Sequence, residues 1–190
     1  FQMGDNIVHE LDKISEQFNL DTTTYISNKI NQYLPNTKVF MSIGNHESFP
    51  VDQYDQMASD TAWLLPGLAE AYGNTIPQAS KDQLSKKGFY SERIPERNLK
   101  IISLFGQVYD SMNFYLLMRT FDPLGQLLWL QRELEASEKI DEDVFIIMHI
   151  PLGTDFAIAK WNDVFNALME RFANTVVSLF SGHTHSDHLK

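Results

Sequence analysis

Short runs of strand-forming apolar residues alternate along this chain with segments whose apolar residues recur at helical spacing. The runs at 38–43, 99–105, 144–148 and 176–180 are predicted to be strands that are buried on most sides. A strand, helix, strand alternation of this kind favours a layered α/β fold. The sequence contains no internal repeat, low-complexity tract or Gly/Ser linker, so we expect one continuous domain.

Helices are predicted where apolar residues lie three or four positions apart, with Asp122 and Pro123 opening the middle helix. Proline and glycine punctuate residues 48–87, which are predicted to be an elaborated loop region with short helical pieces. Residues 88–91 are predicted to pair with 99–105 across a polar turn. The apolar stripes expected to face the core are Ile26, Ile30 and Leu34; Leu127, Leu130 and Leu134; and Trp161, Phe165, Leu168 and Phe172.

The composition limits the chemistry that is available. Hydrophobic residues make up 43% of the 190, which suits a packed core. A formal net charge of −10 repels phosphate backbones and anionic membranes, so a nucleic-acid polymer is not an expected partner. No stretch approaches 18 apolar residues, so no transmembrane segment is expected. Because the chain has no cysteine, any metal site must use His, Asp, Asn or Glu.

Residues that can ligate metals follow the apolar runs at four places. In layered α/β folds the ends of strands meet at one edge, and ligands collect there because the loops vary while the strands fix their bases. We therefore expect these residues to lie together. They are Asp5 after Gly4, the segment Gly44-Asn45-His46-Glu47, His149, and the segment Gly182-His183-Thr184-His185.

Taken one at a time, most of these residues have an ordinary structural explanation. Asp5 could cap a helix, and Asn45 after a glycine could form a turn. A lone His149 would more often be a hydrogen-bonded core histidine. His183 and His185 differ, because two imidazoles at i and i+2 of an extended segment point to the same side and favour metal ligation.

Together, a carboxylate, an amide oxygen and three imidazoles match the preferences of zinc, manganese or iron, whereas calcium or magnesium would need more oxygens. A two-metal hydrolase is the natural hypothesis, with ions roughly 3.5–4 Å apart around a bridging hydroxide. Asp5 is suited to bridge such a pair. His188 has no comparable context and is predicted to be a solvated side chain.

The order of these motifs resembles that of the calcineurin-like metallophosphoesterases. Within that superfamily, the chain is most similar to the acid sphingomyelinase-like phosphodiesterases, and the likeness covers essentially the whole chain. The supporting segments are 88–91, 113–117, 122–130 and the stretch around Trp161.

The resemblance implies a metallophosphatase-type two-sheet β-sandwich flanked by helices. It also implies that a metal-bound hydroxide at a dinuclear site hydrolyses phosphodiesters. The substrate would be a small phosphodiester or a lipid headgroup, such as a sphingomyelin-like choline phosphodiester or a nucleotide derivative. The two divalent ions would be zinc, with manganese or iron as alternatives.

The resemblance also assigns roles to individual residues. Asp5 would bridge both metals, and His185 would ligate the second. His46 would lie beside the scissile phosphate, as transition-state stabiliser or as acid for the leaving oxygen. His9 matches a second histidine proposed for that proton delivery, and it could equally be a helix-side histidine. The remaining ligands of the first metal would be Asn45, His149 and His183.

The chain departs from the family pattern at both ends. The Asp-x-His motif that completes the second metal's ligands would lie upstream of Phe1, and the strands expected after the His-Thr-His segment would lie beyond Lys190. We therefore expect residues 1–190 to be a partial metallophosphoesterase catalytic domain, truncated at both ends. Another chain or segment would then complete the fold.

Three questions about function stay open at this point. The chain could be a catalytically inactive scaffold or assembly subunit, or a phosphomonoesterase on the same metals. A secreted or lysosomal location, as in the family, is weakened by the absence of cysteine and of Asn-x-Ser/Thr acceptors. Selectivity would come from loops 48–87 and 106–119, whose aromatic residues either line a pocket or only pack. These residues are Tyr54, Trp63, Tyr109 and Tyr115.

Overall fold

The computed structural model describes residues 1–119 and 121–187, so His188 lies outside the described residues. It confirms the α/β class: the named strands form a single four-stranded sheet in the order β1-β2-β3-β4. β1 is antiparallel to β2, and the other pairs are parallel. The strands are β1 (Tyr90–Ile94), β2 (Leu99–Ser103), β3 (Asp143–Ile147) and β4 (Val176–Phe180). The α-helices are α1 (Glu16–Tyr33), α2 (Leu64–Ala71), α3 (Gln78–Lys87), α4 (Gln126–Glu138) and α5 (Ala159–Arg171).

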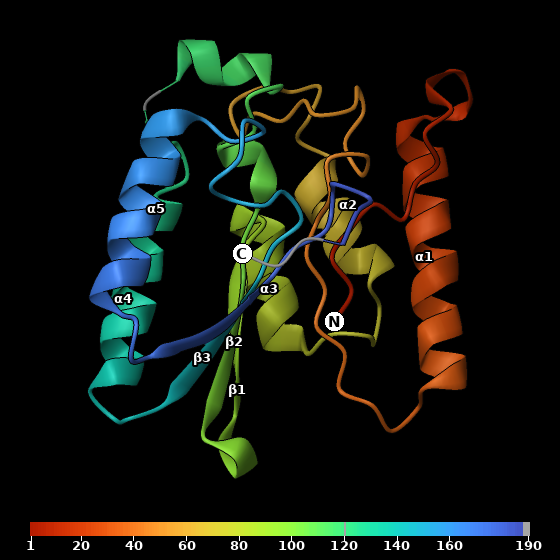
Figure 1. Ribbon diagram of the computed structural model, residues 1–190. Helices are drawn as coiled ribbons and strands as arrows, with labels where there is room; N and C mark the ends of the chain where they lie inside the picture. Colours follow the sequence, from red (N-terminus) through yellow and green to blue (C-terminus); the bar gives the residue numbers. More distant parts are fainter. Residues whose placement is uncertain (120, 188–190) are drawn as a thin grey trace.

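Helices cover the sheet on both sides. Figure 1 shows α4 and α5 against one face, with α2, α3 and then α1 on the other side. Along β3 the side chains alternate between two apolar clusters: Val144 and Ile146 belong to the main core, and Ile147 packs in a second cluster with Ile101 and Phe40. The period of two is that of a strand buried on both faces. The burial predicted for 176–180 is wrong, because β4 lies at the edge of the sheet and Val177 and Leu179 are exposed.

The predicted hairpin is confirmed, with Tyr90 opposite Ser103 in the register. The predicted stripes on α4 and α5 also face the core: Leu130, Leu134 and Trp161 have no exposed surface. α4 begins at Gln126, four residues beyond Asp122, whose carboxylate accepts the N–H groups of Gln126 and Leu127 at 3.0 Å. An acidic side chain at this end stabilises the helix.

The prediction of a strand at 38–43 is wrong: this segment forms no regular strand and pairs with the N-terminal segment through one isolated parallel bridge, between Met41 and Gln2. The resemblance implies two sheets. The described residues form one four-stranded sheet, and the second sheet is represented among them only by this bridge. Tyr90 of β1 ties the bridge to the sheet: its hydroxyl accepts the N–H of Met41 and donates to the carbonyl of the same residue, both at 2.9 Å.

The core stripe predicted at Ile26, Ile30 and Leu34 is confirmed only for Ile30, which packs against the main core, because the fully buried positions of α1 are polar. Ile26 and Ile30 are only partly buried, and Leu34, at the end of the helix, is 49% exposed. The buried positions of α1 are Asn19, Thr23 and Ser27. Their small side chains let α1 approach the rest of the molecule closely, and Asn19 reaches a loop of the site described below.

The loop region predicted at 48–87 contains two regular helices, α2 and α3. Leu64, Leu65 and Leu68 of α2 are buried in the main core. A Cβ at Gly67 would meet the Leu20 side chain at 2.8 Å, so the absence of a side chain lets α2 approach α1. A glycine in this segment thus allows helix packing, where the sequence indicated only a turn. None of the described helices is both long and apolar enough to cross a membrane.

Tyr90→Phe tests the connection between the sheet and the Met41 bridge. The variant leaves the buried N–H of Met41 without its acceptor, whereas the Met41 carbonyl keeps the Ser103 hydroxyl as donor. We expect the free energy of unfolding to fall by roughly 1–3 kcal/mol in urea denaturation. Tyr25→Phe, at an exposed position of α1, is the control and should change it little. Equal stability of the two variants would contradict the assignment.

Candidate metal centre

The segments that follow β3 and β4 meet two turns near the Gln2–Met41 bridge. β3 leads to His149, and β4 leads to the 182–185 loop. The other two turns contain Gly4-Asp5 and the 44–47 segment. The structure brings the seven predicted site residues to this one place. They are Asp5, His9, Asn45, His46, His149, His183 and His185.

A close approach of two glycines sets the spacing of the first two turns. A Cβ on Gly4 would collide with the backbone of Gly44, and a Cβ on Gly44 would collide with the backbone of Asp5. Gly4 and Asp5 both have positive φ, 82° and 56°. Asp5 adopts this left-handed conformation although it is not glycine, so its surroundings must hold it there.

Glu47 holds the two turns together. Its buried carboxylate accepts the backbone N–H groups of Gly44 at 2.7 Å, Asp5 at 2.9 Å and Asn6 at 2.6 Å. Burial and the nearby charge of Asp5 raise the pKa of Glu47, and the N–H donors of Asn6 and Asp5 oppose that rise. Glu47 is thus a clamp between the turns, a role that the sequence motif alone did not reveal.

Asp5 places its carboxylate at the centre of the site. One oxygen accepts the N–H of His46 at 3.0 Å, and the other lies 3.1 Å from Nε2 of His149. Burial acts to raise the pKa of Asp5, but the hydrogen bond and charge of His149 outweigh it and lower the pKa overall. The Asp5 carboxylate is therefore ionised at neutral pH.

Asn45 is oriented by a neighbour on its own loop. Its Nδ2 donates to Oδ1 of Asp52 at 2.7 Å, which turns Oδ1 of Asn45 toward the histidines. That oxygen lies 2.9 Å from Nε2 of His149 and 3.1 Å from Nδ1 of His183. Asp52 was not predicted as a site residue, and an acid seven positions after Asn45 in a loop gives no sequence signal for this contact.

His149 has its two ring nitrogens in different surroundings. Nδ1 lies 2.5 Å from the carbonyl oxygen of Met3, which can only accept, so Nδ1 carries a proton. Three lone-pair atoms surround Nε2: Oδ1 of Asn45, Oδ2 of Asp5 at 3.1 Å and Nδ1 of His183 at 3.3 Å. Burial lowers the pKa of His149, but the Asp5 carboxylate raises it overall.

Lone pairs of several side chains converge on Nε2 of His149, as the ligands of a cation do. One proton on Nε2 of His149 cannot satisfy the oxygens of Asn45 and Asp5 and the nitrogen of His183 together. A divalent cation accepts all four as ligands, and Asn, Asp and His form a donor set suited to zinc and similar ions. The residues present therefore fit the metal that the motifs predict.

His183 approaches this group from the loop after β4, where its φ of 67° turns the chain. Burial and the charge of His149 lower the pKa of His183, which keeps the imidazole neutral and able to ligate. The ring of Phe156 meets the His183 ring edge-on, with centroids 4.6 Å apart. Phe156 thus limits the orientations that the His183 ring can take.

A second group lies on the other side of Asp5. Asp5, His9 and His185 each offer one ligand atom, and these atoms lie within 4.8 Å of one another. Asp5, His149 and His183 form the first such group by the same measure, so Asp5 is common to both. The ring of His9 lies 4.0 Å from that of His46, centroid to centroid. Burial lowers the pKa of His46, although the charge of Asp5 opposes this.

Two further residues that the sequence analysis missed support the 44–48 loop. Asn19 of α1 donates from Nδ2 to the carbonyls of His46 at 3.2 Å and Glu47 at 3.1 Å. Gln107 donates to the carbonyl of Gly44 at 2.7 Å. Both side chains are buried, and neither lies next to a recognisable motif. Only the three-dimensional structure places them against this loop.

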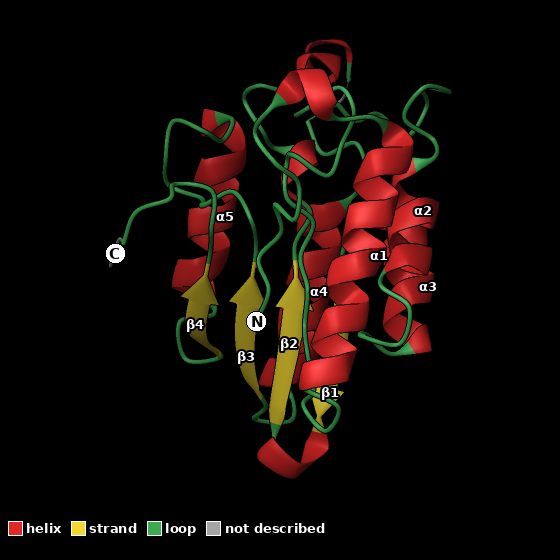
Figure 2. Cartoon of the chain, turned by 90° about the vertical axis from the view of Figure 1, so that its right-hand side faces the viewer, coloured by secondary structure: helices red, strands yellow, loops and turns green. Residues whose placement is uncertain are grey.

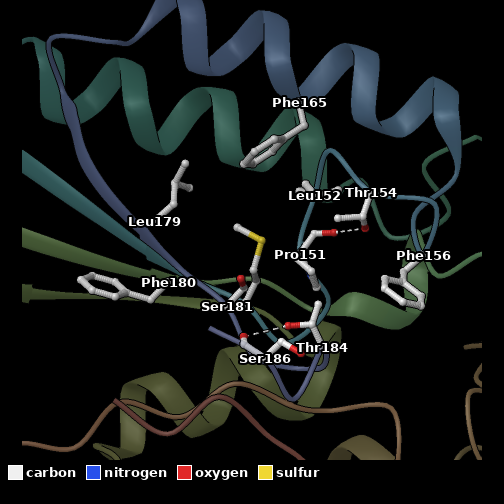
Figure 3. A pocket seen from close by; sticks show the side chains of 12 residues that line it. Pro151, Leu152, Thr154, Phe156, Phe165, Leu179, Phe180, Ser181, Thr184 and Ser186 are labelled. Atoms are coloured by element: carbon white, nitrogen blue, oxygen red, sulfur yellow. Dashed lines mark hydrogen bonds between the residues drawn. The ribbon is translucent and has the colours of Figure 1, made fainter. Parts of the chain in front are cut away.

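The aromatic residues considered for selectivity mainly pack. Tyr54 and Tyr109 are buried in the core, and Trp63 packs against it. Tyr115 donates its hydroxyl to Asp60. A cavity of about 390 Å³ lies instead beside the 182–186 loop, between that loop and α5 (Figure 3). Its apolar lining includes Leu152, Phe156, Phe165 and Leu179.

The profile of the family described as calcineurin-like phosphoesterase matches residues 2–187. The chain belongs to the calcineurin-like phosphoesterases. A similar curated protein is Sphingomyelin phosphodiesterase of Bos taurus. It is 35% identical over 97% of this chain and 30% of its own length. Sphingomyelin phosphodiesterase 2 of Caenorhabditis elegans is 33% identical over 97% of this chain and 31% of its own.

The human Cyclic GMP-AMP phosphodiesterase SMPDL3A is also similar, at 29% identity over 97% of this chain and 42% of its own length. These matches confirm the predicted likeness to sphingomyelinase-like phosphodiesterases. The chain spans about a third of the length of the sphingomyelin phosphodiesterases that it matches. Calcineurin-like phosphoesterases generally use divalent metals, and the Asp and His groups above are possible ligands for them.

Asp110 lies behind the site and has an unusual environment. It is 3% exposed, and one carboxylate oxygen accepts the N–H of Met112 at 2.8 Å. Within the part of the chain that the structure describes, the other oxygen is buried without a hydrogen-bond partner. Burial, aided by the charge of Asp52, raises the pKa of Asp110 to about 7.

Glu47→Gln tests the clamp between the two turns. The amide group of glutamine replaces one acceptor oxygen with a donor that faces backbone N–H groups. We expect the free energy of unfolding to fall by roughly 1–3 kcal/mol, and the affinity for zinc in a calorimetric titration to fall about 10-fold or more. Glu70→Gln on the exposed face of α2 is the control. Unchanged zinc affinity in Glu47→Gln would show that the clamp does not position the ligands.

Asp110→Asn tests the buried carboxyl through the pH dependence of stability. An unfolded chain ionises Asp near pH 3.9, roughly, whereas the folded chain keeps the proton up to about pH 7. The folded state therefore loses stability as the pH rises through this window, and the substitution removes that loss. The free energy of unfolding of the variant should exceed that of the wild type by roughly 1–3 kcal/mol at about pH 7.5, and by little at about pH 4.5. Urea denaturation at both values measures this, with exposed Asp163→Asn as control.

Proposed function

We propose that this protein hydrolyses phosphodiesters with two divalent cations, zinc by preference, held around Asp5. The observation that carries the proposal is that Asp5 belongs to both groups of potential ligands, Asp5–His149–His183 and Asp5–His9–His185. A carboxylate shared in this way suits a site for two neighbouring ions. The membership of the chain in the calcineurin-like phosphoesterases supports the same reaction class.

The residues of the first group have distinct tasks in this proposal. Asp5, Asn45, His149 and His183 would hold one ion, and the Met3 carbonyl fixes the His149 tautomer that leaves Nε2 free to ligate. When bound, the ions supply Lewis acidity toward a phosphoryl oxygen and lower the pKa of water. The exposed side chain of His185 leaves the centre open to a substrate from solvent.

His46 is the residue proposed to assist the leaving group. It is 8% exposed, it lies on the Asn45 loop, and its backbone N–H donates to Asp5. Its Nδ1 is buried and has no hydrogen-bond partner among the described residues. We assign His46 to stabilise the charge that develops on the phosphate or to protonate the leaving oxygen, the two tasks that the family resemblance gives to this position.

The substrate class follows from charge and from the relatives. A formal net charge of −10 disfavours a nucleic-acid polymer, whose phosphates would be repelled. Relatives are named sphingomyelin phosphodiesterase and cyclic GMP-AMP phosphodiesterase. We therefore propose a small phosphodiester, either a choline phosphodiester of the sphingomyelin kind or a nucleotide derivative.

Hydrolysis of bis(p-nitrophenyl) phosphate by the zinc-loaded full-length protein tests the proposal. Asn45→Ala and His183→Ala should lower kcat/KM by about 100-fold or more, because each removes a ligand of the first ion. Asn28→Ala, at an exposed position of α1, should leave activity unchanged. Comparison with p-nitrophenyl phosphate separates diester from monoester hydrolysis. A protein that binds one ion or none and hydrolyses neither compound would instead be an inactive scaffold.

A further inference from the structure

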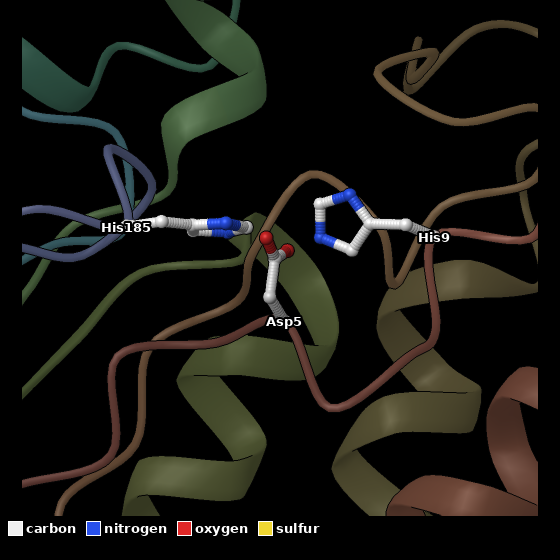
Figure 4. A group of neighbouring side chains, drawn as sticks. All are labelled: Asp5, His9 and His185. Atoms are coloured by element: carbon white, nitrogen blue, oxygen red, sulfur yellow. The ribbon is translucent and has the colours of Figure 1, made fainter.

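Asn113 is a buried asparagine to which the proposed reaction gives no task. It is 2% exposed, and it opens the 113–117 segment, one of those that carry the family resemblance. It belongs to neither group of potential ligands; these groups meet at the Asp5 carboxylate, which Figure 4 shows between two imidazole rings. A buried amide finds its hydrogen-bond partners within the protein. The partners of Asn113 lead to the loop that carries Asn45.

The side-chain amide of Asn113 acts as donor and as acceptor. Its Nδ2 donates to the carbonyl oxygens of Gln107 at 2.7 Å and Tyr54 at 2.8 Å. Its Oδ1 accepts the backbone N–H of Tyr115 at 3.3 Å, which caps the 3-10 helix η4 (Phe114–Met118). An aspartate of the same size could accept this N–H, but its carboxylate has no hydrogen to donate to the two carbonyls.

The contact with Gln107 reaches one end of the Asn45 loop. The Gln107 side chain is fully buried, and its Nε2 donates to the carbonyl of Gly44 at 2.7 Å. Gly44 precedes Asn45 and has little room to move, because a Cβ on it would collide with the backbone of Asp5. Asn113 holds the main chain of Gln107, and Gln107 holds the residue before Asn45.

The contact with Tyr54 reaches the other end of the same loop. Tyr54 follows two residues after Asp52, whose carboxylate accepts Nδ2 of Asn45 at 2.7 Å. The backbone N–H of Asp52 also donates to the carbonyl of Asn45, at 3.1 Å. Between them, the Gln53 side chain has hydrogen bonds to the residues before and after Asn113. Asn113 therefore fixes the end of the loop from which Asp52 orients the Asn45 amide.

We propose that Asn113 is a positioning residue for Asn45, and through Asn45 for the first ion. It holds both ends of the 44–54 loop, so that Oδ1 of Asn45 stays 2.9 Å from Nε2 of His149 and 3.1 Å from Nδ1 of His183. A ligand that is already in place loses less conformational freedom when the ion binds, which raises the affinity. The inference rests on the proposed function for the first ion, and it does not require a particular substrate.

Asn113→Asp tests the inference, because it keeps the size of the side chain and the cap of η4 while removing both donors. The full-length protein is stripped of metal with a chelator, and its affinity for Zn²⁺ is measured by calorimetric titration. Asn45→Ala identifies the ion that Asn45 ligates, and in Asn113→Asp the Kd of this ion should rise about 10-fold or more. The visible spectrum of the Co²⁺-substituted variant should also change, since it reports the arrangement of the ligands.

A second variant guards against misfolding caused by a buried charge. Asn113→Ser introduces no charge and leaves at most one of the two donors. It should raise the same Kd in the same direction, by a smaller factor than Asn113→Asp.

A double-mutant cycle separates positioning from a general loss of stability. In the Asn45→Ala background, Asn113→Asp should change the Kd for zinc by less than about 2-fold, because the ligand through which it acts is gone. Ser137→Ala is the matched control. It removes a buried hydrogen bond to Glu142, which precedes β3, whereas His149 follows β3. This control should lower the stability in urea denaturation and leave the Kd and the Co²⁺ spectrum unchanged.

The outcomes distinguish the inference from the proposed function. An unchanged Kd and Co²⁺ spectrum in both Asn113 variants would overturn the inference and leave the proposed function intact. So would an equal effect of Asn113→Asp with and without the Asn45 side chain. A wild type that binds no zinc would overturn both, whereas zinc binding without hydrolysis of bis(p-nitrophenyl) phosphate would overturn the proposed function alone.

Discussion

A buried carboxylate joins two chain turns at a distance that only glycine permits. Glu47 has no exposed surface, and three backbone N–H groups supply the hydrogen bonds that its buried carboxyl group needs. The same contacts bring Gly4 against Gly44, where a side chain on either residue would collide with backbone. Asp5 and Asn45, the next residues along each turn, thereby face the same volume.

The sheet supplies the rest of the centre. β3 and β4 are parallel neighbours, so the loops after them emerge side by side and carry His149 and the 183–185 segment to the turns held by Glu47 (Figure 2). Asp5 and His149 then stabilise each other's charged forms: the pKa of Asp5 is lowered and that of His149 is raised. The strands and the Glu47 clamp thus hold the candidate ligands in one place, and the opposite charges of Asp5 and His149 offset each other there.

The positions of strands, and of the polar residues after them, could be predicted from the sequence because apolar runs and the motifs are local signals. The polar buried face of α1 could not be predicted. The spacing of Ile26, Ile30 and Leu34 does not show which segments pack against the helix. The two helices within 48–87 were hidden for the opposite reason: Gly67, which looks like a helix breaker, permits close packing against Leu20. Contacts between distant segments, such as Asn45 with Asp52, lie beyond any local pattern.

The amide of Asn19 couples a whole helix to the loop that carries the ligands. It donates to consecutive carbonyls of that loop from the buried face of α1, so the loop can rearrange only if the helix shifts or these hydrogen bonds break. Among the helices, α1 packs against α2, and it also has hydrogen bonds to Thr75 in the loop between α2 and α3. Unfolding of α1 would therefore release this loop, and with it the arrangement of the candidate ligand side chains.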